Sequence, residues 1–322
     1  MAQLIDLKDK KIISQLDLNS RQTNKQIAKK VGLSEQVTGN RIKRLIDLKI
    51  IDYFYVRINP SLLGFMHLKI YLRLHNLTKQ KEGELIKELI LAKGIFWLAS
   101  LRGKYDLVLS LYVKNMYDFS QKYEGLLGKW GNYILLRNVV FLEKVQMYNK
   151  KYLIPKSETV VFTYSEGKEQ SLEIDKLDSE LLKILNIQGR KSLIEISQQL
   201  KTSPDTIRYR LKNLEKKKII TGYGVKINYN KLNYNYHLIV LKLQEMNSQK
   251  YQKLEILSRL NKNILYFIKT IGDHELELEV ETTSKEELDQ IIQILRDHFV
   301  SEIKDYELLE VTKEHRLTYF PF

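Results

Sequence analysis

Two stretches of the sequence combine an apolar stripe with polar side chains of the kind that contact nucleic-acid bases. Residues 34–51 are SEQVTGNRIKRLIDLKII, and residues 203–220, which begin 169 positions later, are SPDTIRYRLKNLEKKKII. In the second stretch Ile207, Leu211 and Leu214 follow the i, i+4, i+7 spacing of one helix face. The opposite face then carries the polar residues, and amide and guanidinium groups pair well with base edges in the major groove of B-DNA.

Both stretches are therefore predicted to be DNA-recognition helices. The residues predicted to contact DNA are Ser34, Gln36, Asn40, Arg41, Lys43 and Arg44 in the first helix, and Ser203, Thr206, Arg208, Tyr209, Arg210 and Lys212 in the second. Arg57 and Lys226, in the segment after each helix, are predicted to contact phosphates, which adds salt-dependent affinity without sequence preference. The alternative is that these basic faces are merely solvated.

The two helices differ where they would meet the bases. Gly39 takes the place of Arg208, and Thr38 takes the place of the aliphatic Ile207. Glycine destabilises a helix by about 1 kcal/mol relative to alanine. We therefore hypothesise that the two helices recognise different base sequences and that the second is the better-formed reader.

The similarity between the two stretches belongs to a repeat that covers the chain. Shifting the sequence by 169 residues aligns Val56-Arg57-Ile58-Asn59 with Val225-Lys226-Ile227-Asn228 and Gly103 with Gly272, without a gap. The chain is therefore interpreted as two copies of a two-domain unit. The expected segments are a first helical domain at 1–60, a second domain at 61–154, a joining segment at 155–172, and the corresponding domains of copy two at 173–232 and 233–322.

The first domain of each copy has the pattern of a winged helix-turn-helix. The pairs Thr23…Gln26 and Ser192…Glu195 predict capping boxes at the start of a second helix. A tight turn and a third helix, capped by Ser34 or Ser203, follow, and this preceding structure favours DNA contact over a solvated face. The strands expected after the third helix would form the wing.

The second domain of each copy alternates strands and helices. In copy one the expected elements are strand 66–75, helix 79–92, strands 95–102 and 105–113, helix 115–128 and strand 134–146. Copy two repeats the pattern from 236 to 315. This βαββαβ order is ferredoxin-like, so the fold class is α+β. In the joining segment TVVFTY, at 159–164, is expected to pair as a strand.

The order of these features resembles the Lrp/AsnC (feast/famine) family of transcription regulators. The resemblance rests on the helix-turn-helix, the wing, NPSLLGF at 59–65, the ferredoxin-like domain and GKYDL at 103–107. It implies a cytoplasmic, sequence-specific regulator whose partner is double-stranded DNA. Family members usually carry one copy and pair with a second chain, so this fused chain is expected to form a pseudo-dimer or a homo-oligomer through its ferredoxin-like domains.

The resemblance also implies a small effector, often an amino acid, near the Gly-x-Tyr-Asp turn. Copy one keeps this motif as Gly103, Tyr105 and Asp106, whereas copy two has Gly272 followed by Asp273-His274-Glu275. An aspartate there would accept a ligand ammonium or hold the turn itself. Both interpretations stay open for copy one, and for copy two we favour a turn without a ligand.

Charge patterning suggests how the two ferredoxin-like domains meet. Residues 61–157 hold 16 basic and 7 acidic residues, whereas residues 233–322 hold 11 and 16. In HELELEVE, at 274–281, the glutamates share one strand face, and His67-to-Arg73 places Lys69 and Tyr71 on the corresponding face of copy one. If these faces meet, opposite charges would select a mixed pair. A solvated acidic edge is the alternative.

Composition excludes several other chemistries. The chain has no cysteine, which excludes disulfides and thiolate metal sites, and its six histidines lack metal-ligand spacing. No apolar run is long enough to cross a bilayer, and no cofactor motif is present. We expect a non-enzymatic, cytoplasmic protein without cofactor or metal and without a membrane partner.

Two further functions are alternatives to transcription regulation. Sirohaem decarboxylases resemble these regulators and also occur as fused pairs, but they place an Arg-His pair before a Gly-aromatic motif. The corresponding segments here, NPSLLGFMH at 59–67 and NYNKLNYNYH at 228–237, lack that pair. An architectural DNA-binding protein without an effector is the other alternative, and the sequence does not separate it from a specific regulator.

Overall fold

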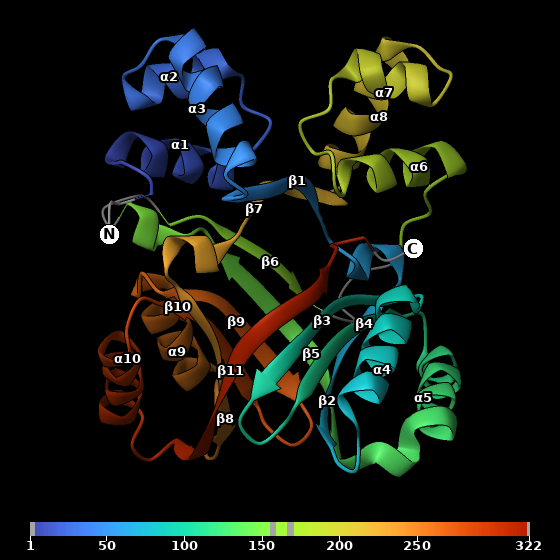
Figure 1. Cartoon of the computed structure of the whole chain (residues 1–322), viewed down its shortest axis with the longest axis vertical. Coiled ribbons are helices and arrows are strands. Elements are labelled where there is room, and N and C mark those ends of the chain that lie inside the picture. The colour runs from blue at the N-terminus through green and yellow to red at the C-terminus, as the bar shows by residue number, and fades with distance from the viewer. Residues whose placement is uncertain (1–3, 155–158, 166–170, 321–322) are drawn as a thin grey trace.

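The computed structural model describes residues 4–154, 159–165 and 171–320. Two helical heads stand at one end of the molecule, and a large β-structure with helices outside it forms the other end (Figure 1). The first head contains α1 (Leu7–Leu18), α2 (Asn24–Val31) and α3 (Glu35–Asp47), and the second contains α6 (Lys176–Leu185), α7 (Leu193–Gln199) and α8 (Pro204–Lys216).

Local sequence signals set the starts of these helices. Thr23 Oγ1 accepts a hydrogen bond from the Gln26 amide at 3.2 Å, and Gln26 Oε1 accepts one from the Thr23 amide at 2.8 Å. Ser192 and Glu195 make the same reciprocal pair at 3.2 and 3.0 Å. These hydrogen bonds confirm both predicted capping boxes. Each box satisfies amide groups that a helix start leaves unpaired.

The strands that follow the third helices join the two heads. β1 (Ile51–Ile58) and β7 (Ile220–Ile227) pair antiparallel with each other in a two-stranded sheet. Figure 1 shows this sheet between the heads and the rest of the molecule. The sequence predicted a wing beside each recognition helix, and the structure corrects this: each strand's partner comes from the other copy.

The ferredoxin-like units form a single closed sheet. Their strands are β2 (Met66–Leu74), β3 (Ile95–Arg102), β4 (Leu107–Val113), β5 (Ile134–Tyr148), β8 (Asn235–Leu243), β9 (Ile264–Ile271), β10 (Leu276–Thr282) and β11 (Ile303–Leu317). Within the described residues the strand order is β2-β4-β3-β11-β8-β10-β9-β5-β6, where β6 is Val161–Ser165, and β2 also pairs with β5. That extra pairing closes every strand except β6 into a barrel of antiparallel neighbours.

The last strand of each copy crosses into the other copy's sheet. β5 and β11 are each 15 residues long, and β5 pairs with β9 while β11 pairs with β3. The helices α4 (Lys79–Leu91), α5 (Met116–Trp130), α9 (Ser248–Leu260) and α10 (Lys285–His298) lie outside the barrel (Figure 1). Short 3₁₀ helices, η1 (Ser61–Leu63), η2 (Gly131–Tyr133), η3 (Lys151–Leu153) and η4 (Tyr229–Leu232), complete the connections.

Each barrel strand turns one face to the helices and one to the interior. Leu68, Ile70 and Leu72 pack in a buried cluster with side chains of α4 and α5. Leu276, Leu278 and Val280 do the same with α9 and α10. The alternation of two residues per repeat therefore sends the intervening polar side chains into the barrel.

Opposite charges meet inside the barrel, within one chain. Lys69 Nζ donates hydrogen bonds to Glu277 Oε1 at 2.5 Å and to Glu279 Oε1 at 2.7 Å, and the Tyr71 hydroxyl donates to Glu277. Glu281 forms an ion pair with Lys150 at 2.6 Å. The predicted mixed pairing of a basic and an acidic strand is confirmed for Lys69 and Tyr71. The alternative of a solvated acidic edge is wrong.

Part of the joining segment forms the strand expected for it. β6 (Val161–Ser165) pairs antiparallel with β5. The expected segment 155–172 also includes residues 155–158 and 166–170, which lie outside the described residues. The β6 pairing places Phe162 and Tyr164 near the end of the barrel that faces the heads.

Two negative findings apply to the described residues alone. None of their helices combines the length and apolarity that crossing a membrane requires. None of their histidine, aspartate and glutamate side chains gathers in a group of three or more suited to a metal ion.

Candidate nucleic-acid interface

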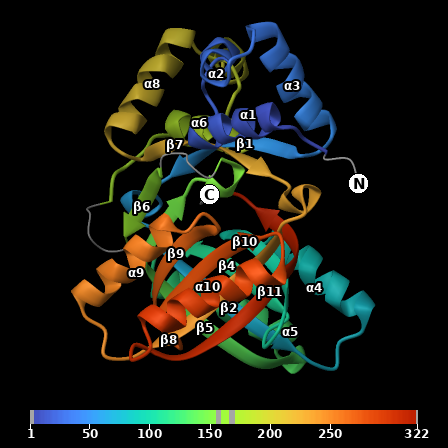
Figure 2. The same ribbon diagram turned by 90° about the vertical axis from the view of Figure 1, so that its left-hand side faces the viewer.

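The predicted recognition helices lie at the end of the molecule opposite the barrel (Figure 2). In α3 the side chains of Thr38, Ile42 and Leu45 are buried, as the stripe predicted. Gln36 and Asn40 are exposed on the other face, so their amide groups are available to a ligand in solution. Lys43 and Arg44 are exposed as well.

In α8 the arrangement is the same but the exposed residues differ. Ile207, Leu211 and Leu214 are buried, whereas Arg208, Tyr209 and Lys212 are exposed. Tyr209 is 68% exposed, which leaves most of a large aromatic side chain in water. Arg208 forms an ion pair with Asp205 one turn earlier on the same helix. The outer face of α8 thus offers a guanidinium, a phenol and an ammonium group.

The serines at the helix starts already have a role in the heads. Ser34 Oγ accepts a hydrogen bond from the Val37 amide at 3.2 Å. Ser203 Oγ accepts one from the Thr206 amide at 3.0 Å, and the two hydroxyl groups of Ser203 and Thr206 lie 2.9 Å apart. These residues are N-caps, which stabilise the recognition helices by about 1 kcal/mol each.

Two of the residues predicted to contact DNA, Arg41 and Arg210, instead form ion pairs within their own heads. Arg41 Nη1 pairs with Asp6 and with the fully buried Asp9, both at 2.8 Å. Its equivalent Arg210 pairs with Asp175 at 2.6 Å. These carboxylates raise the pKa of both guanidinium groups through hydrogen bonds. Arg41 and Arg210 therefore tie the third helix of each head to the first.

Arg44 combines an ion pair within the head with partial exposure to solvent. Its Nη2 lies 2.5 Å from Asp9 Oδ2, yet its side chain remains 48% exposed. A phosphate could therefore reach Arg44 from solvent, although Asp9 competes for its guanidinium. Asn213 stands at the equivalent position of copy two.

The structure contradicts the prediction that Arg57 and Lys226 contact phosphates. Arg57 is 3% exposed, and its guanidinium donates to the carbonyl oxygens of Tyr223 at 2.9 Å and Asp17 at 2.8 Å. Lys226 forms an ion pair with Glu314 at 2.5 Å. Because β1 and β7 pair with each other above the barrel, these side chains point between heads and barrel instead of toward DNA.

Two equivalent arginines link the two heads through hydrogen bonds. Arg21 Nη1 donates to the Gly189 carbonyl of the second head at 2.9 Å. Arg190 Nη1 donates in return to the Gln22 carbonyl of the first head at 2.9 Å. The 169-residue shift also aligns Arg21 with Arg190, although the sequence alone indicates no role for either residue. The identity of this residue in both copies was the signal available.

The glycines of the predicted effector turn are required by packing. Gly103 has φ +139°, and a Cβ there would lie 2.9 Å from Leu309 Cδ2 of β11. Gly272 has φ +151°, and a Cβ there would lie 2.8 Å from Val140 Cγ1 of β5. In each copy the crossing strand of the other copy passes so close that a side chain would collide with it.

The acidic residue of the turn has a backbone partner in both copies. Asp106 Oδ2 accepts a hydrogen bond from the Leu74 amide at 2.7 Å, and Glu275 Oε2 accepts one from the Leu243 amide at 2.7 Å. Of the two interpretations left open, this geometry matches a residue that holds the turn. Tyr105 is 5% exposed, and the adjoining cavity measures about 10 Å³, room for a single water at most.

The exposed third helices on paired heads place the protein in the helix-turn-helix class, and comparison with known proteins agrees. A family model for the AsnC-type helix-turn-helix domain matches residues 5–52 and 174–215, once in each head. The HTH-type transcriptional regulator Ptr1 of Methanocaldococcus jannaschii is 34% identical over 113 residues, which span 35% of this chain and 75% of that protein. The HTH-type transcriptional regulator LrpA of Pyrococcus horikoshii is 37% identical over 98 residues, 28% of this chain and 70% of that protein.

The chain belongs to the Lrp/AsnC family of helix-turn-helix transcription regulators. Its whole length resembles the crystal structure of the siroheme decarboxylase NirDL, with a TM-score of 0.65 over 98% of this chain and 94% of that one. The two are 13% identical, so the likeness shows a shared fold alone. That fold includes both copies.

Proposed function

We propose that this protein regulates transcription by placing α3 and α8 in the major groove of double-stranded DNA. The observation that carries the proposal is that each third helix buries its apolar stripe and leaves a polar outer face free, on the side away from the barrel. A helix of this kind fits the major groove. Gln36, Asn40, Lys43 and Arg44 would contact DNA from α3, and Arg208, Tyr209 and Lys212 from α8.

The two heads would recognise unlike half-sites. Identical heads favour a palindrome, because protein and DNA symmetry match. Here α3 has Gly39 and Asn40 at the positions where α8 has Arg208 and Tyr209. A Cβ at Gly39 would lie 3.0 Å from Asn24 Nδ2 of the same head, so Asn24 would have to move before α3 could carry a side chain like that of Arg208. The favoured target is therefore an asymmetric site, with the stronger contacts under α8.

A regulatory role is favoured over catalysis. The relatives with significant sequence identity are named as regulators, whereas the decarboxylase shares 13% identity with this chain. We infer that the chain is not an enzyme. An amino-acid effector at the Gly103–Asp106 turn remains a prediction. Binding there would require the cavity beside Tyr105 to become larger than its present volume of about 10 Å³. Assembly into a homo-oligomer through the ferredoxin-like domains is likewise proposed.

The deciding experiment is a footprint of the purified chain on its own upstream DNA at two salt concentrations, with and without each amino acid. We expect a defined, asymmetric protected site that weakens as salt rises. Saturating protection of any sequence would favour an architectural protein. No protection at low salt, on this DNA or on pooled genomic fragments, would overturn the proposal.

Paired variants would then assign the half-sites. Gln36→Ala/Asn40→Ala should weaken one half of the footprint, and Arg208→Ala/Tyr209→Ala the other, each by about 10- to 100-fold, since one good base contact contributes about 1–3 kcal/mol. Arg102→Ala is the matched control, because Arg102 is a 73% exposed arginine on the barrel. Equal loss at both halves from either pair would refute two unlike heads.

A further inference from the structure

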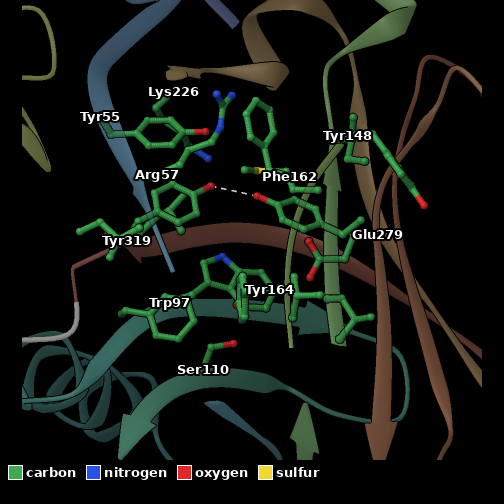
Figure 3. A pocket seen from close by; sticks show the side chains of 18 of the residues that line it. Tyr55, Arg57, Trp97, Ser110, Tyr148, Phe162, Tyr164, Lys226, Glu279 and Tyr319 are labelled. Atoms are coloured by element: carbon green, nitrogen blue, oxygen red, sulfur yellow. Dashed lines mark hydrogen bonds between the residues drawn. The ribbon is translucent and has the colours of Figure 1, made fainter. Parts of the chain in front are cut away.

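A cavity of about 120 Å³ lies between the β1–β7 sheet and the end of the barrel that faces the heads (Figure 3). We call it the upper cavity; Tyr55, Arg57, His67, Trp97, Ser110 and Phe162 are among its lining residues. It is partly open, so a small molecule can enter without unfolding the chain. None of the DNA-facing side chains of α3 or α8 lines it.

Flat aromatic side chains form much of its wall. Phe162 of β6 packs against the guanidinium of Arg57, with 4.0 Å from Arg57 Cζ to the ring centre. Tyr55 and Tyr319 stack with their ring centres 4.4 Å apart. Trp97 is 5% exposed and comes from β3. Walls of this kind favour a planar ring, which can stack against them or meet their edges.

The charges around the upper cavity are compensated. The ion pairs that line it are Arg57–Asp17 at 3.5 Å, Lys69–Glu279 at 2.7 Å, Lys150–Glu281 at 2.6 Å and Lys226–Glu314 at 2.5 Å. Burial lowers the pKa of His67 well below its ordinary value, so its imidazole is neutral at pH 7. A charged ligand would lose its hydration without gaining an unpaired counter-charge, so a neutral ligand is favoured.

Several buried polar atoms of the lining lack a partner among the described residues. They are Ser110 Oγ, His67 Nε2 and Arg57 Nε, in residues that are 1%, 4% and 3% exposed. Ser110 and His67 lie on the paired strands β4 and β2, with one residue pair between them. A buried polar group without a partner costs about 1–3 kcal/mol. A ligand edge that both donates and accepts hydrogen bonds would remove that cost.

We propose that the upper cavity binds a neutral, single-ring nitrogen heterocycle whose edge carries both a hydrogen-bond donor and an acceptor. The size fits: a protein cavity of about 150 Å³ holds one benzene ring, so about 120 Å³ has room for a single ring. The aromatic walls hold the ring, and Ser110 and His67 bind its polar edge. The cavity shares no lining residue with α3 or α8, so its ligand binding can be tested without DNA.

Calorimetry and tryptophan fluorescence on the full chain test this site. Uracil and nicotinamide are the probes, benzoate is the charged control and toluene the apolar one. The chain has two tryptophans, so Trp130→Phe leaves Trp97 as the single reporter in the cavity wall. We expect one uracil or nicotinamide per chain, a change in Trp97 emission, and binding at least tenfold weaker for benzoate and toluene.

Matched serine variants locate the probe. Ser110→Ala should weaken binding about tenfold, the effect of one lost hydrogen bond, and Ser110→Val should weaken it further by filling the cavity. Ser258→Ala is the control, because Ser258 is also buried with an unpartnered hydroxyl but lies in α9. Three results would each overturn the proposal. They are the absence of binding of either heterocycle at about 10 mM, a very weak affinity for a specific site, equal binding of toluene, and unchanged affinity in both Ser110 variants.

Discussion

At the scale of single residues, the buried charges of the barrel are the most consequential feature. Lys69 is 2% exposed and Glu277 is fully buried. Burial alone would lower the pKa of Lys69, but the adjacent carboxylates of Glu277 and Glu279 raise it. The cation and its two carboxylates therefore depend on one another, because each would be costly to bury alone.

Replacing Lys69 should strongly destabilise the protein. Lys69→Met leaves two carboxylates in the barrel without a cation, and we expect a loss of about 3–5 kcal/mol in the free energy of unfolding, measured in urea. The triple variant Lys69→Met/Glu277→Gln/Glu279→Gln should recover much of that loss, because it removes the charges as well. An unchanged urea midpoint in the single variant would show that these charges are not coupled.

Glu279 should also make stability depend on pH. Burial raises the pKa of Glu279 to about 7, from 4.5. Between pH 4.5 and about pH 7 the folded protein keeps the carboxyl proton of Glu279, which the unfolded chain releases. The contribution of Glu279 to stability therefore falls as pH rises through this range. The stability of the wild type relative to Glu279→Gln should therefore drop by about 2 kcal/mol between pH 5 and 7.5 in urea unfolding. A constant difference would contradict the raised pKa.

At the scale of elements, glycine has opposite effects in helices and in turns. Gly83 in α4 and Gly125 in α5 have open space where a Cβ would stand. Gly103 sits in a turn with positive φ and against Leu309 of the crossing strand β11. The same substitution should therefore stabilise the helices and destabilise the turn.

Alanine substitutions at these three sites test the opposite effects of glycine in helices and in turns. Gly83→Ala and Gly125→Ala should each stabilise the protein by about 0.5–1 kcal/mol, because alanine restricts the unfolded chain and favours the helix. Gly103→Ala should lower stability by more than about 1 kcal/mol, since it strains the backbone and presses on β11. Urea unfolding gives all three values; a tolerated Gly103→Ala would mean that β11 yields at this contact.

At the scale of the whole molecule, the fused chain holds its heads at a set separation. The β1–β7 ladder and the reciprocal contacts of Arg21 and Arg190 link the first head to the second. A site that engages both heads gains from this, because the second head binds at high effective concentration once the first is bound.

Breaking the arginine contacts should weaken two-headed binding selectively. Arg21→Ala/Arg190→Ala should reduce affinity for the full site about tenfold and leave affinity for an isolated half-site nearly unchanged, measured by fluorescence anisotropy. Arg296→Ala on α10 is the control, because that exposed arginine lies on the barrel. Equal losses on full and half-sites would instead make Arg21 and Arg190 part of the DNA contact itself.

Much of this protein was determined by short-range sequence signals. The capping boxes, the apolar stripes of α3 and α8 and the alternation in HELELEVE act within one element, so periodicity and hydrogen-bonding chemistry suffice to predict them. The exposed Gln36 and Arg208 followed directly from the same periodicity. The ion pair of Lys69 with Glu277 was predictable from charge complementarity, because each residue lies on a strand face that is not covered by helices.

Tertiary structure alone decided which strands became neighbours. Arg57 and Lys226 are basic residues on strands, and only the pairing of β1 with β7 turned them away from DNA and into the space above the barrel. The closing of the barrel by β5 and β11, the need for glycine at 103 and the upper cavity likewise depend on contacts between residues far apart in the chain. Local periodicity carries no information about such contacts, because many pairings satisfy the same pattern of buried and exposed side chains.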